Sequence, residues 1–156
     1  MATHTFTNPD TGATATIISG KPNSGKSKAL LDYIKRVPPG TPVLVVSNEF
    51  SQQQLVQRVG DVPGVTLLCN VTFEEVLARL PSIATAESSP RGLLLVDGLD
   101  YFHVDGTLRD AATALVDEAA RLGVSVVMTV QERRTGGVNW NRGGEPFPKV
   151  MGDGSL

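Results

Sequence analysis

The chain has 156 residues, of which 40% are hydrophobic and 19% charged, and this size and balance are typical of one soluble globular domain with its own core. Its formal net charge of -2 excludes a bulk attraction to nucleic acid, so any such contact needs a local basic patch. A single cysteine, Cys69, excludes an intramolecular disulfide. The sequence shows no signal-peptide pattern and no apolar run near the ~20 residues of a membrane span. We therefore expect a cytoplasmic protein without a membrane segment.

Strand-like and helix-like segments alternate along the chain. Turn-forming residues at 8–12 predict an N-terminal hairpin over about residues 3–18. Apolar or β-branched runs predict strands at 13–19, 43–47, 65–68, 93–97 and 124–130. Helical spacing predicts helices at 27–37, 51–60, 72–80 and 107–123, the third opening with the capping-box pair Thr72 and Glu75. This alternation indicates an α/β fold with a mainly parallel central sheet and helices on both faces.

A glycine-containing loop lies between the first core strand and the first helix. Residues 20–27 read Gly-Lys-Pro-Asn-Ser-Gly-Lys-Ser, which satisfies the P-loop pattern G-x-x-x-x-G-K-[ST] in its expected strand–loop–helix context. In such loops backbone amides form a nest for phosphate oxygens, the lysine (Lys26) reaches the β- and γ-phosphates, and the hydroxyl (Ser27) binds Mg²⁺. The predicted nucleotide-binding residues are Gly20, Lys21, Pro22, Asn23, Ser24, Gly25, Lys26, Ser27 and Lys28. For Lys21 alone, a solvated loop lysine is the more common role.

Three acidic residues follow apolar runs. Asp97 ends the run at 93–96 and holds the Walker B position, where an acid binds Mg²⁺ directly or through water. Asp100 competes for that role, but it lies past the strand, where we expect an exposed or capping acid. Glu49 comes just after the strand at 43–47, where an acid either polarises the attacking water or simply begins a helix near its positive end. The residues by themselves leave both roles of Glu49 open.

The segment SNEFSQQQLVQR, residues 47–58, resembles the RecA-like ATPase core of DnaB-type replicative helicases. In that family the second strand is followed by Ser-x-Glu-Met and a helix rich in Gln, Leu and Arg, and Phe50 stands here in place of Met. The resemblance extends over roughly residues 15–134. It implies a RecA-like P-loop NTPase fold, with Glu49 as the catalytic base. It also implies that Gln131, at the end of the last strand, senses the γ-phosphate.

The C-terminal stretch differs in composition from the rest. We expect residues 1–132 to form the ATPase core and residues 133–156 to form a Gly-rich basic loop or tail. Arg133, Arg134 and Arg142 are candidates for an arginine finger, although loop arginines are usually solvated. Basic residues beside Trp140 are compatible with single-stranded nucleic acid. A surface loop with Trp140 packed against the body is the favoured interpretation.

These features together predict Mg²⁺-dependent binding and hydrolysis of ATP. The first hypothesis is a helicase-like motor that acts with nucleic acid in DNA replication, as a homo-oligomeric ring. The alternative is a regulatory or partner-binding module with little turnover that docks on a related ATPase ring. The unmatched DNA-binding loop and trans-acting arginine of the family favour the module, whereas the Glu49 segment favours the motor. A small-molecule P-loop kinase ranks last, because no arginine-rich lid precedes Gln131.

Overall fold

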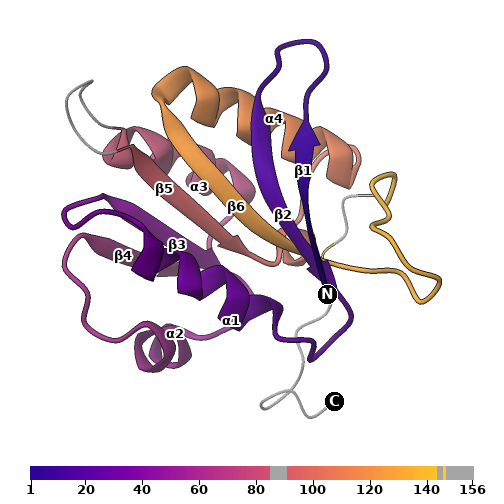
Figure 1. Cartoon of the computed structure of the whole chain (residues 1–156). Coiled ribbons are helices and arrows are strands. Elements are labelled where there is room, and N and C mark those ends of the chain that lie inside the picture. Colours follow the sequence, from indigo (N-terminus) through magenta and orange to yellow (C-terminus); the bar gives the residue numbers. More distant parts are fainter. Residues whose placement is uncertain (85–90, 144–145, 147–156) are drawn as a thin grey trace.

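A single β-sheet forms the centre of the molecule (Figure 1). Within residues 1–84, 91–143 and 146, which the computed structural model describes, six strands follow the spatial order β1-β2-β6-β5-β3-β4. All neighbours pair in parallel except β1, which runs antiparallel to β2. The strands are β1 (Ala2–Thr7), β2 (Thr14–Gly20), β3 (Val43–Ser47), β4 (Val65–Cys69), β5 (Gly92–Asp97) and β6 (Val124–Gln131). The predicted mainly parallel sheet is confirmed.

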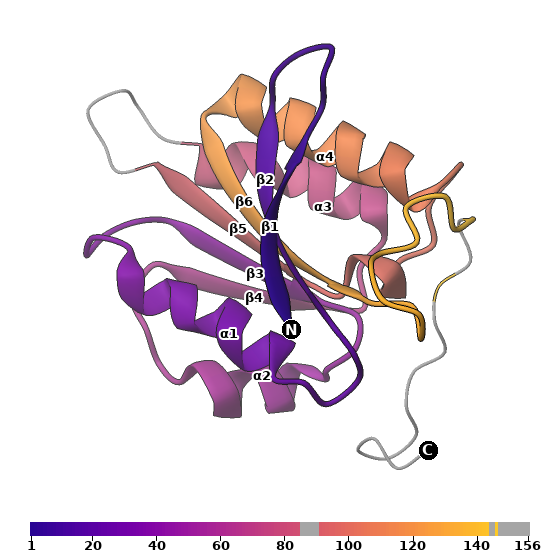
Figure 2. The same ribbon diagram turned by 45° about the vertical axis from the view of Figure 1, so that its right-hand side comes forward.

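Helices cover both faces of this sheet (Figures 1 and 2). On one face lie α1 (Lys26–Leu31) and α2 (Gln52–Val59), and on the other lie α3 (Phe73–Arg79) and α4 (Leu108–Leu122). Three short 3₁₀ turns complete the described elements: η1 (Asp32–Arg36), η2 (Leu80–Ile83) and η3 (Leu99–Tyr101). The helix expected over 27–37 is therefore α-helical only in its first half. Its second half winds more tightly, and Val37 is extended, as a residue before a proline prefers.

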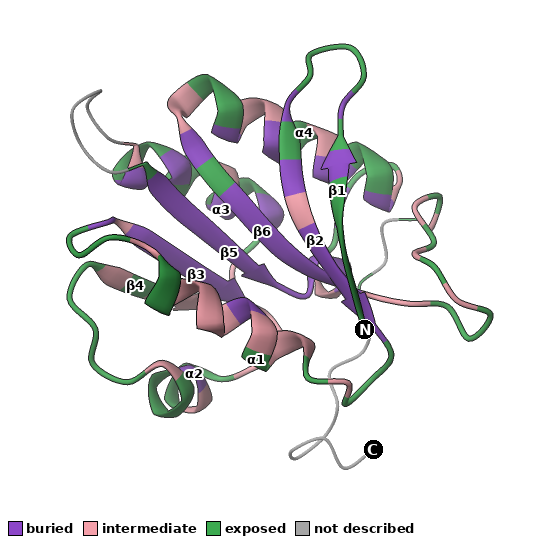
Figure 3. Cartoon of the chain, in the orientation of Figure 1, coloured by how far each residue is buried: buried purple, intermediate pink, exposed green. Residues whose placement is uncertain are grey.

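Two apolar cores lie on the two faces of the sheet. Successive residues of β3 alternate between them: Leu44 and Val46 belong to the core with α3 and α4, and Val43 and Val45 to the core with α1 and α2. Every residue of β3 and β5 is buried (Figure 3). Strands covered on both faces need apolar residues at every position. This explains why β3 and β5 read as continuous apolar runs.

Three helices begin with a capping box, in which a side chain and a backbone amide bond each other reciprocally. The pairs are Ser51 with Gln54 in α2, Thr72 with Glu75 in α3, and Thr107 with Asp110 in α4. The pair predicted at Thr72 is therefore confirmed. The cap residue of α2, Ser51, lies two positions after Glu49, so it fixes where the helix starts relative to that residue.

The stretch after β6 folds back onto α4 (Figure 2). The Trp140 ring packs against the ring of Phe6 on β1, with centroids 5.0 Å apart. The first amides of α4, at Leu108 and Arg109, donate to the carbonyl oxygens of Arg142 and Trp140 at 2.9 Å. Trp140 thus packs against the body, as favoured from the sequence. The rest of the predicted Gly-rich tail, apart from residue 146, lies outside the described residues.

Bilayer-crossing helices are not found in the described structure: none of the helices within 1–84 and 91–143 has both the length and the apolar character required.

Candidate functional site

The carboxyl ends of four parallel strands bring the predicted site residues to one edge of the sheet. In the strand register Gly20 on β2 lies opposite Gln131 on β6, and Ser47 on β3 lies opposite Asp97 on β5. Since β5 and β6 are also neighbours, these strand ends form one continuous edge. Ligands of parallel α/β sheets bind at such an edge. Residues far apart in the sequence are therefore combined in one candidate nucleotide site.

The P-loop backbone has the sharp turns that a phosphate nest requires. Asn23 and Gly25 have positive φ angles of 62° and 91°, and the Ser24 amide donates to the Lys21 carbonyl at 3.2 Å. A Cβ atom at Gly20 would overlap the Ser24 hydroxyl oxygen and lie 3.3 Å from Cγ of Lys26. Glycine at position 20 thus lets the strand end approach the loop closely.

Two side chains of the loop present hydrogen-bonding groups suited to an anionic ligand. The Lys26 ammonium donates to the Lys21 carbonyl oxygen at 2.9 Å and, with three donors in all, retains capacity for phosphate oxygens. The Ser24 hydroxyl oxygen is a buried side-chain atom without a hydrogen-bond partner among the described residues. A buried polar group of this kind calls for a polar partner, and a phosphate group would supply one.

Asp97 is the centre of a hydroxyl cluster. One carboxylate oxygen accepts from the Ser27 hydroxyl at 2.8 Å and from the Thr129 hydroxyl at 3.5 Å, and the other accepts from Ser47 at 3.1 Å. Asp97 is only 2% exposed. Burial raises the pKa of its carboxyl, and the hydrogen bonds from Ser27 and Ser47 oppose that rise.

The Ser27 and Asp97 oxygens fit the requirements of Mg²⁺. This ion prefers oxygen ligands, keeps several waters and is usually bound by one or two protein groups together with phosphate oxygens. Ser27 and Asp97 come from α1 and β5, and their oxygens lie 2.8 Å apart. No group of three or more His, Cys, Asp or Glu side chains in the described parts of the chain is arranged to hold a metal ion.

Glu49 lies within reach of the charges of this site. Burial raises its pKa from 4.5 to about 7, the neighbouring Asp97 contributes to the rise, and the Lys26 ammonium opposes it. Burial and the Glu49 carboxylate, which accepts a hydrogen bond from the Tyr101 side chain, raise the pKa of Tyr101. On the outer side, the Arg58 guanidinium stacks over the Phe50 ring at 4.3 Å from its centroid. The charges of Asp97 and Lys26 therefore both act on the Glu49 carboxyl.

Asp100 was expected to be an exposed or capping acid, and this prediction is wrong. The residue is only 2% exposed, and its carboxylate accepts a hydrogen bond from the Gln131 amide at 2.9 Å. The cause is Gly98, whose positive φ of 85° turns the chain directly after β5 into η3. Asp100 consequently folds back and links the ends of β5 and β6.

Gln131 and the candidate arginines occupy different surroundings. The Gln131 backbone is held by Asp100, and its side chain is half-buried beside the P-loop strand. Arg142 is half-buried, and its charge acts on Asp100 of its own chain. Arg133 and Arg134 are exposed, and the Lys21 ammonium donates to the Arg134 carbonyl at 3.5 Å. Lys21 thus joins the P-loop to the turn after β6.

Three residues of the site had not been predicted: Ser47, Thr129 and the inward-facing Asp100. Ser47 and Thr129 each lie two positions before a predicted functional residue, Glu49 and Gln131. Thr129 and Gln131 share a face of β6, because side chains two apart on a strand do so, whereas Glu49 lies beyond the end of β3. The only signal in the sequence was a hydroxyl residue two positions before each of Glu49 and Gln131. Whether these hydroxyls meet Asp97 depends on the order of the strands.

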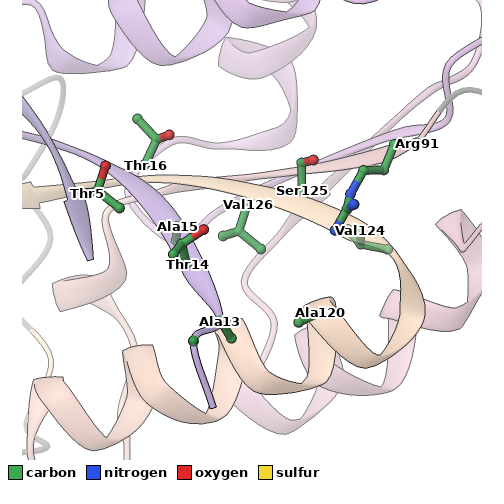
Figure 4. A pocket seen from close by; sticks show the side chains of 11 residues that line it. Thr5, Ala13, Thr14, Ala15, Thr16, Arg91, Ala120, Val124, Ser125 and Val126 are labelled. Atoms are coloured by element: carbon green, nitrogen blue, oxygen red, sulfur yellow. The ribbon is translucent and has the colours of Figure 1, made fainter. Parts of the chain in front are cut away.

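The hollow shown in Figure 4 is separate from this site. It measures about 450 Å³ and lies at the amino ends of β2 and β6, where Thr5, Thr14, Thr16, Ser125 and Arg91 contribute to its lining. None of the predicted nucleotide-site residues lines it. The candidate site is therefore assigned from the strand-end cluster and not from this hollow.

The titration of Glu49 is testable without any substrate. The folded chain holds the Glu49 proton up to about pH 7, whereas the ordinary pKa is 4.5, so between these values the folded state binds more protons than the unfolded state. The free energy of unfolding of the wild type should therefore fall, relative to that of Glu49→Gln, as the pH rises through this window. Urea denaturation at a series of pH values measures the difference.

Glu74→Gln is the matched control, because Glu74 is exposed in the first turn of α3. Its difference from the wild type should stay constant across the same pH range. A constant difference for Glu49→Gln as well would show that the Glu49 carboxyl is not buried among these charges.

No protein-family model matches the chain, and no curated protein matches its sequence. Among solved structures, the chain is similar to a DnaB-like replicative helicase from a study of that helicase and its interactions with primase. The two superpose with a TM-score of 0.61 at 12% identity, over 76% of this chain. The fold is RecA-like. The chain spans 40% of the length of that helicase chain, and at this identity the similarity concerns the fold.

Two secretion ATPases are more distant. The cytoplasmic domain of the Thermomonospora curvata type VII secretion ATPase EccC gives a TM-score of 0.46 at 11% identity, covering 80% of this chain and 18% of that one. EssC (ATPases 2 and 3) from Geobacillus thermodenitrificans gives 0.45 at 12% identity, covering 88% and 34%.

Proposed function

We propose that this chain binds ATP together with Mg²⁺ and hydrolyses its terminal phosphate. The observation that carries the proposal is the contact between Ser27 and Asp97, 2.8 Å apart, at the sheet edge where the charges of Lys26 and Glu49 also meet. These four residues supply the ammonium, the hydroxyl and the two acids that triphosphate hydrolysis requires.

The P-loop holds the triphosphate. Its inward-turned backbone amides and the Lys26 ammonium bind the β- and γ-phosphate oxygens, and the buried Ser24 hydroxyl gains a partner there. Ser27 and Asp97 would hold Mg²⁺, directly or through water, and the ion held there would supply neutralisation of the charge that develops on the phosphate oxygens.

Glu49 serves as the general base. Its carboxylate orients a water in line with the γ-phosphate and accepts a proton from it as the oxygen–phosphorus bond forms and the bond to the leaving diphosphate breaks. A carboxyl with a pKa raised to about 7 is a stronger base than an ordinary glutamate, yet it is substantially ionised at neutral pH. Gln131, at the end of the strand beside the P-loop, senses the γ-phosphate.

We further propose that turnover is coupled to nucleic acid in a DnaB-like, ring-forming ATPase of the cytoplasm that takes part in DNA replication. The RecA-like fold and the Glu49 segment support this assignment. Arg133 and Arg134 are exposed, and the Lys21 ammonium of the P-loop donates to the Arg134 carbonyl, which supports a role for these arginines toward a neighbouring subunit or a nucleic acid strand.

The decisive experiment measures phosphate release from ATP by the purified protein, with and without single-stranded DNA, together with its mass in solution. We expect magnesium-dependent turnover that single-stranded DNA stimulates severalfold, and a mass of several subunits. Tight ATP binding by a monomer with negligible turnover would instead support the partner-binding module. Absence of ATP binding would refute both.

A further inference from the structure

Ser47 lies among the predicted site residues and bonds to Asp97, although no role was predicted for it. It is the last residue of β3 and is completely buried, with 0% exposure. Its hydroxyl group makes hydrogen bonds in two directions, toward β5 and toward the segment that leads into α2. A buried serine at the end of an otherwise apolar strand needs such partners, because an unsatisfied hydroxyl there is costly.

The two directions of bonding connect two different acids. The Ser47 hydroxyl donates to one oxygen of Asp97 at 3.1 Å. The Ser47 hydroxyl oxygen itself accepts hydrogen bonds from the backbone amides of Glu49 at 3.2 Å and of Phe50 at 3.0 Å. One hydroxyl group thereby fixes the backbone that carries Glu49 relative to the carboxylate of Asp97. This full use of its donor and acceptor capacity leaves the group in a single orientation.

Several contacts restrain Glu49, and the Ser47 link is the one that ties its backbone to Asp97. The following residues begin α2 through the Ser51 cap, and the Arg58 guanidinium stacks over the Phe50 ring; both restraints belong to α2 and the turn before it. The Glu49 carboxylate accepts a hydrogen bond from the Tyr101 side chain of η3, which restrains the side chain and not the backbone. Ser47 connects the Glu49 backbone to the P-loop helix, because Asp97 is in turn bonded to Ser27.

We propose that Ser47 is a positioning residue that ties the catalytic base to the magnesium-binding acid. The inference rests on the proposed function, because it gives Glu49 and Asp97 those roles. A small displacement of a reacting group costs one to two orders of magnitude in rate. The Ser47 hydroxyl thus sets the position of the Glu49 backbone relative to the carboxylate of Asp97.

The test compares Ser47→Ala with Thr41→Val. Thr41 is also buried, lies just before the opposite end of β3 and donates to the Pro38 carbonyl at 2.6 Å, so both substitutions remove one buried hydroxyl. Ser47→Cys is the second variant at the site, because a thiol keeps nearly the same volume but is a weak donor and acceptor. Thermal unfolding first establishes that each variant is folded.

Ser47→Ala and Ser47→Cys should bind a fluorescent ATP analogue with a Kd within about threefold of the wild type, since the P-loop is intact, and lose about 10- to 100-fold in kcat. Thr41→Val should change neither Kd nor kcat. A hydroxyl that only stabilised the fold would lower stability without lowering kcat at an unchanged Kd.

Wild-type kcat in folded Ser47→Ala would overturn the inference and leave the proposed function standing. If the wild type releases no phosphate, the proposed hydrolysis fails separately. Ser47 is then judged by the Mg²⁺ concentration that half-maximally promotes nucleotide binding. This concentration should rise at least about fivefold in Ser47→Ala, because the Asp97 carboxylate loses the hydrogen bond that orients it, and an unchanged value would reject the positioning role.

Discussion

The Glu49→Gln variant is expected to bind ATP with nearly the affinity of the wild type and to lose at least about 100-fold in kcat, within the range that general-base catalysis contributes. Glutamine keeps the shape of glutamate but cannot accept the proton of the attacking water. The hydrogen bonds that fix this segment to Ser47 come from the backbone of Glu49 and Phe50, so the substitution leaves them in place. Single-turnover phosphate release and nucleotide titration separate the two effects.

Glu74→Gln again provides the control, because it makes the same chemical change on the exposed surface of α3. It should hydrolyse ATP at the wild-type rate. Unchanged turnover in Glu49→Gln would assign the base elsewhere, and the buried Asp100, whose carboxylate binds the Gln131 amide, would be the next carboxyl to replace.

The Lys26→Ala variant is expected to weaken ATP binding by about 100-fold, equivalent to about 2.7 kcal/mol, and to abolish measurable turnover. The ammonium bonded to the Lys21 carbonyl is the P-loop group that reaches the β- and γ-phosphates. Charge-assisted hydrogen bonds to phosphate are among the strongest that a side chain makes. The affinity for AMP, which lacks the β- and γ-phosphates, should change much less.

Lys35→Ala is the matched control for Lys26→Ala. Lys35 lies in η1 on the same connection after the P-loop, and its exposed ammonium lies 4.0 Å from Asp32. Its removal should leave ATP affinity unchanged. An equal loss of affinity in both variants would indicate a general effect of positive charge, and an unchanged affinity in Lys26→Ala would place the triphosphate away from the P-loop.

Much of the fold could be predicted because its signals are local. The runs that became β3 and β5 are apolar at every position, which only strands covered on both faces require. The P-loop was recognisable because its turns and its lysine lie within eight consecutive residues, 20–27. The continuation of α1 as a 3₁₀ turn was not predicted, because helical spacing alone does not distinguish the two windings over a few residues.

The candidate site was predictable only in part, for the same physical reason. Asp97 and Lys26 each stand in a motif that their neighbours define. Asp100 was expected on the surface, because its sequence position past the strand does not reveal that Gly98 turns the chain back toward β6. The predicted role of Glu49 depended on a resemblance to a helicase family, because local sequence patterns do not indicate which charges will lie near its carboxyl.

The sequence by itself determined the alternation of strands and helices and contained the P-loop pattern and the candidate acids, because each of these features lies in contiguous residues or short periodicities. The tertiary structure alone decided that the Ser27 hydroxyl lies 2.8 Å from Asp97, 70 residues away, and that Ser47 joins Asp97 to the Glu49 segment. Such contacts depend on which strands become neighbours and in which register they pair. That choice is made by the burial of both sheet faces at once, not by any single segment.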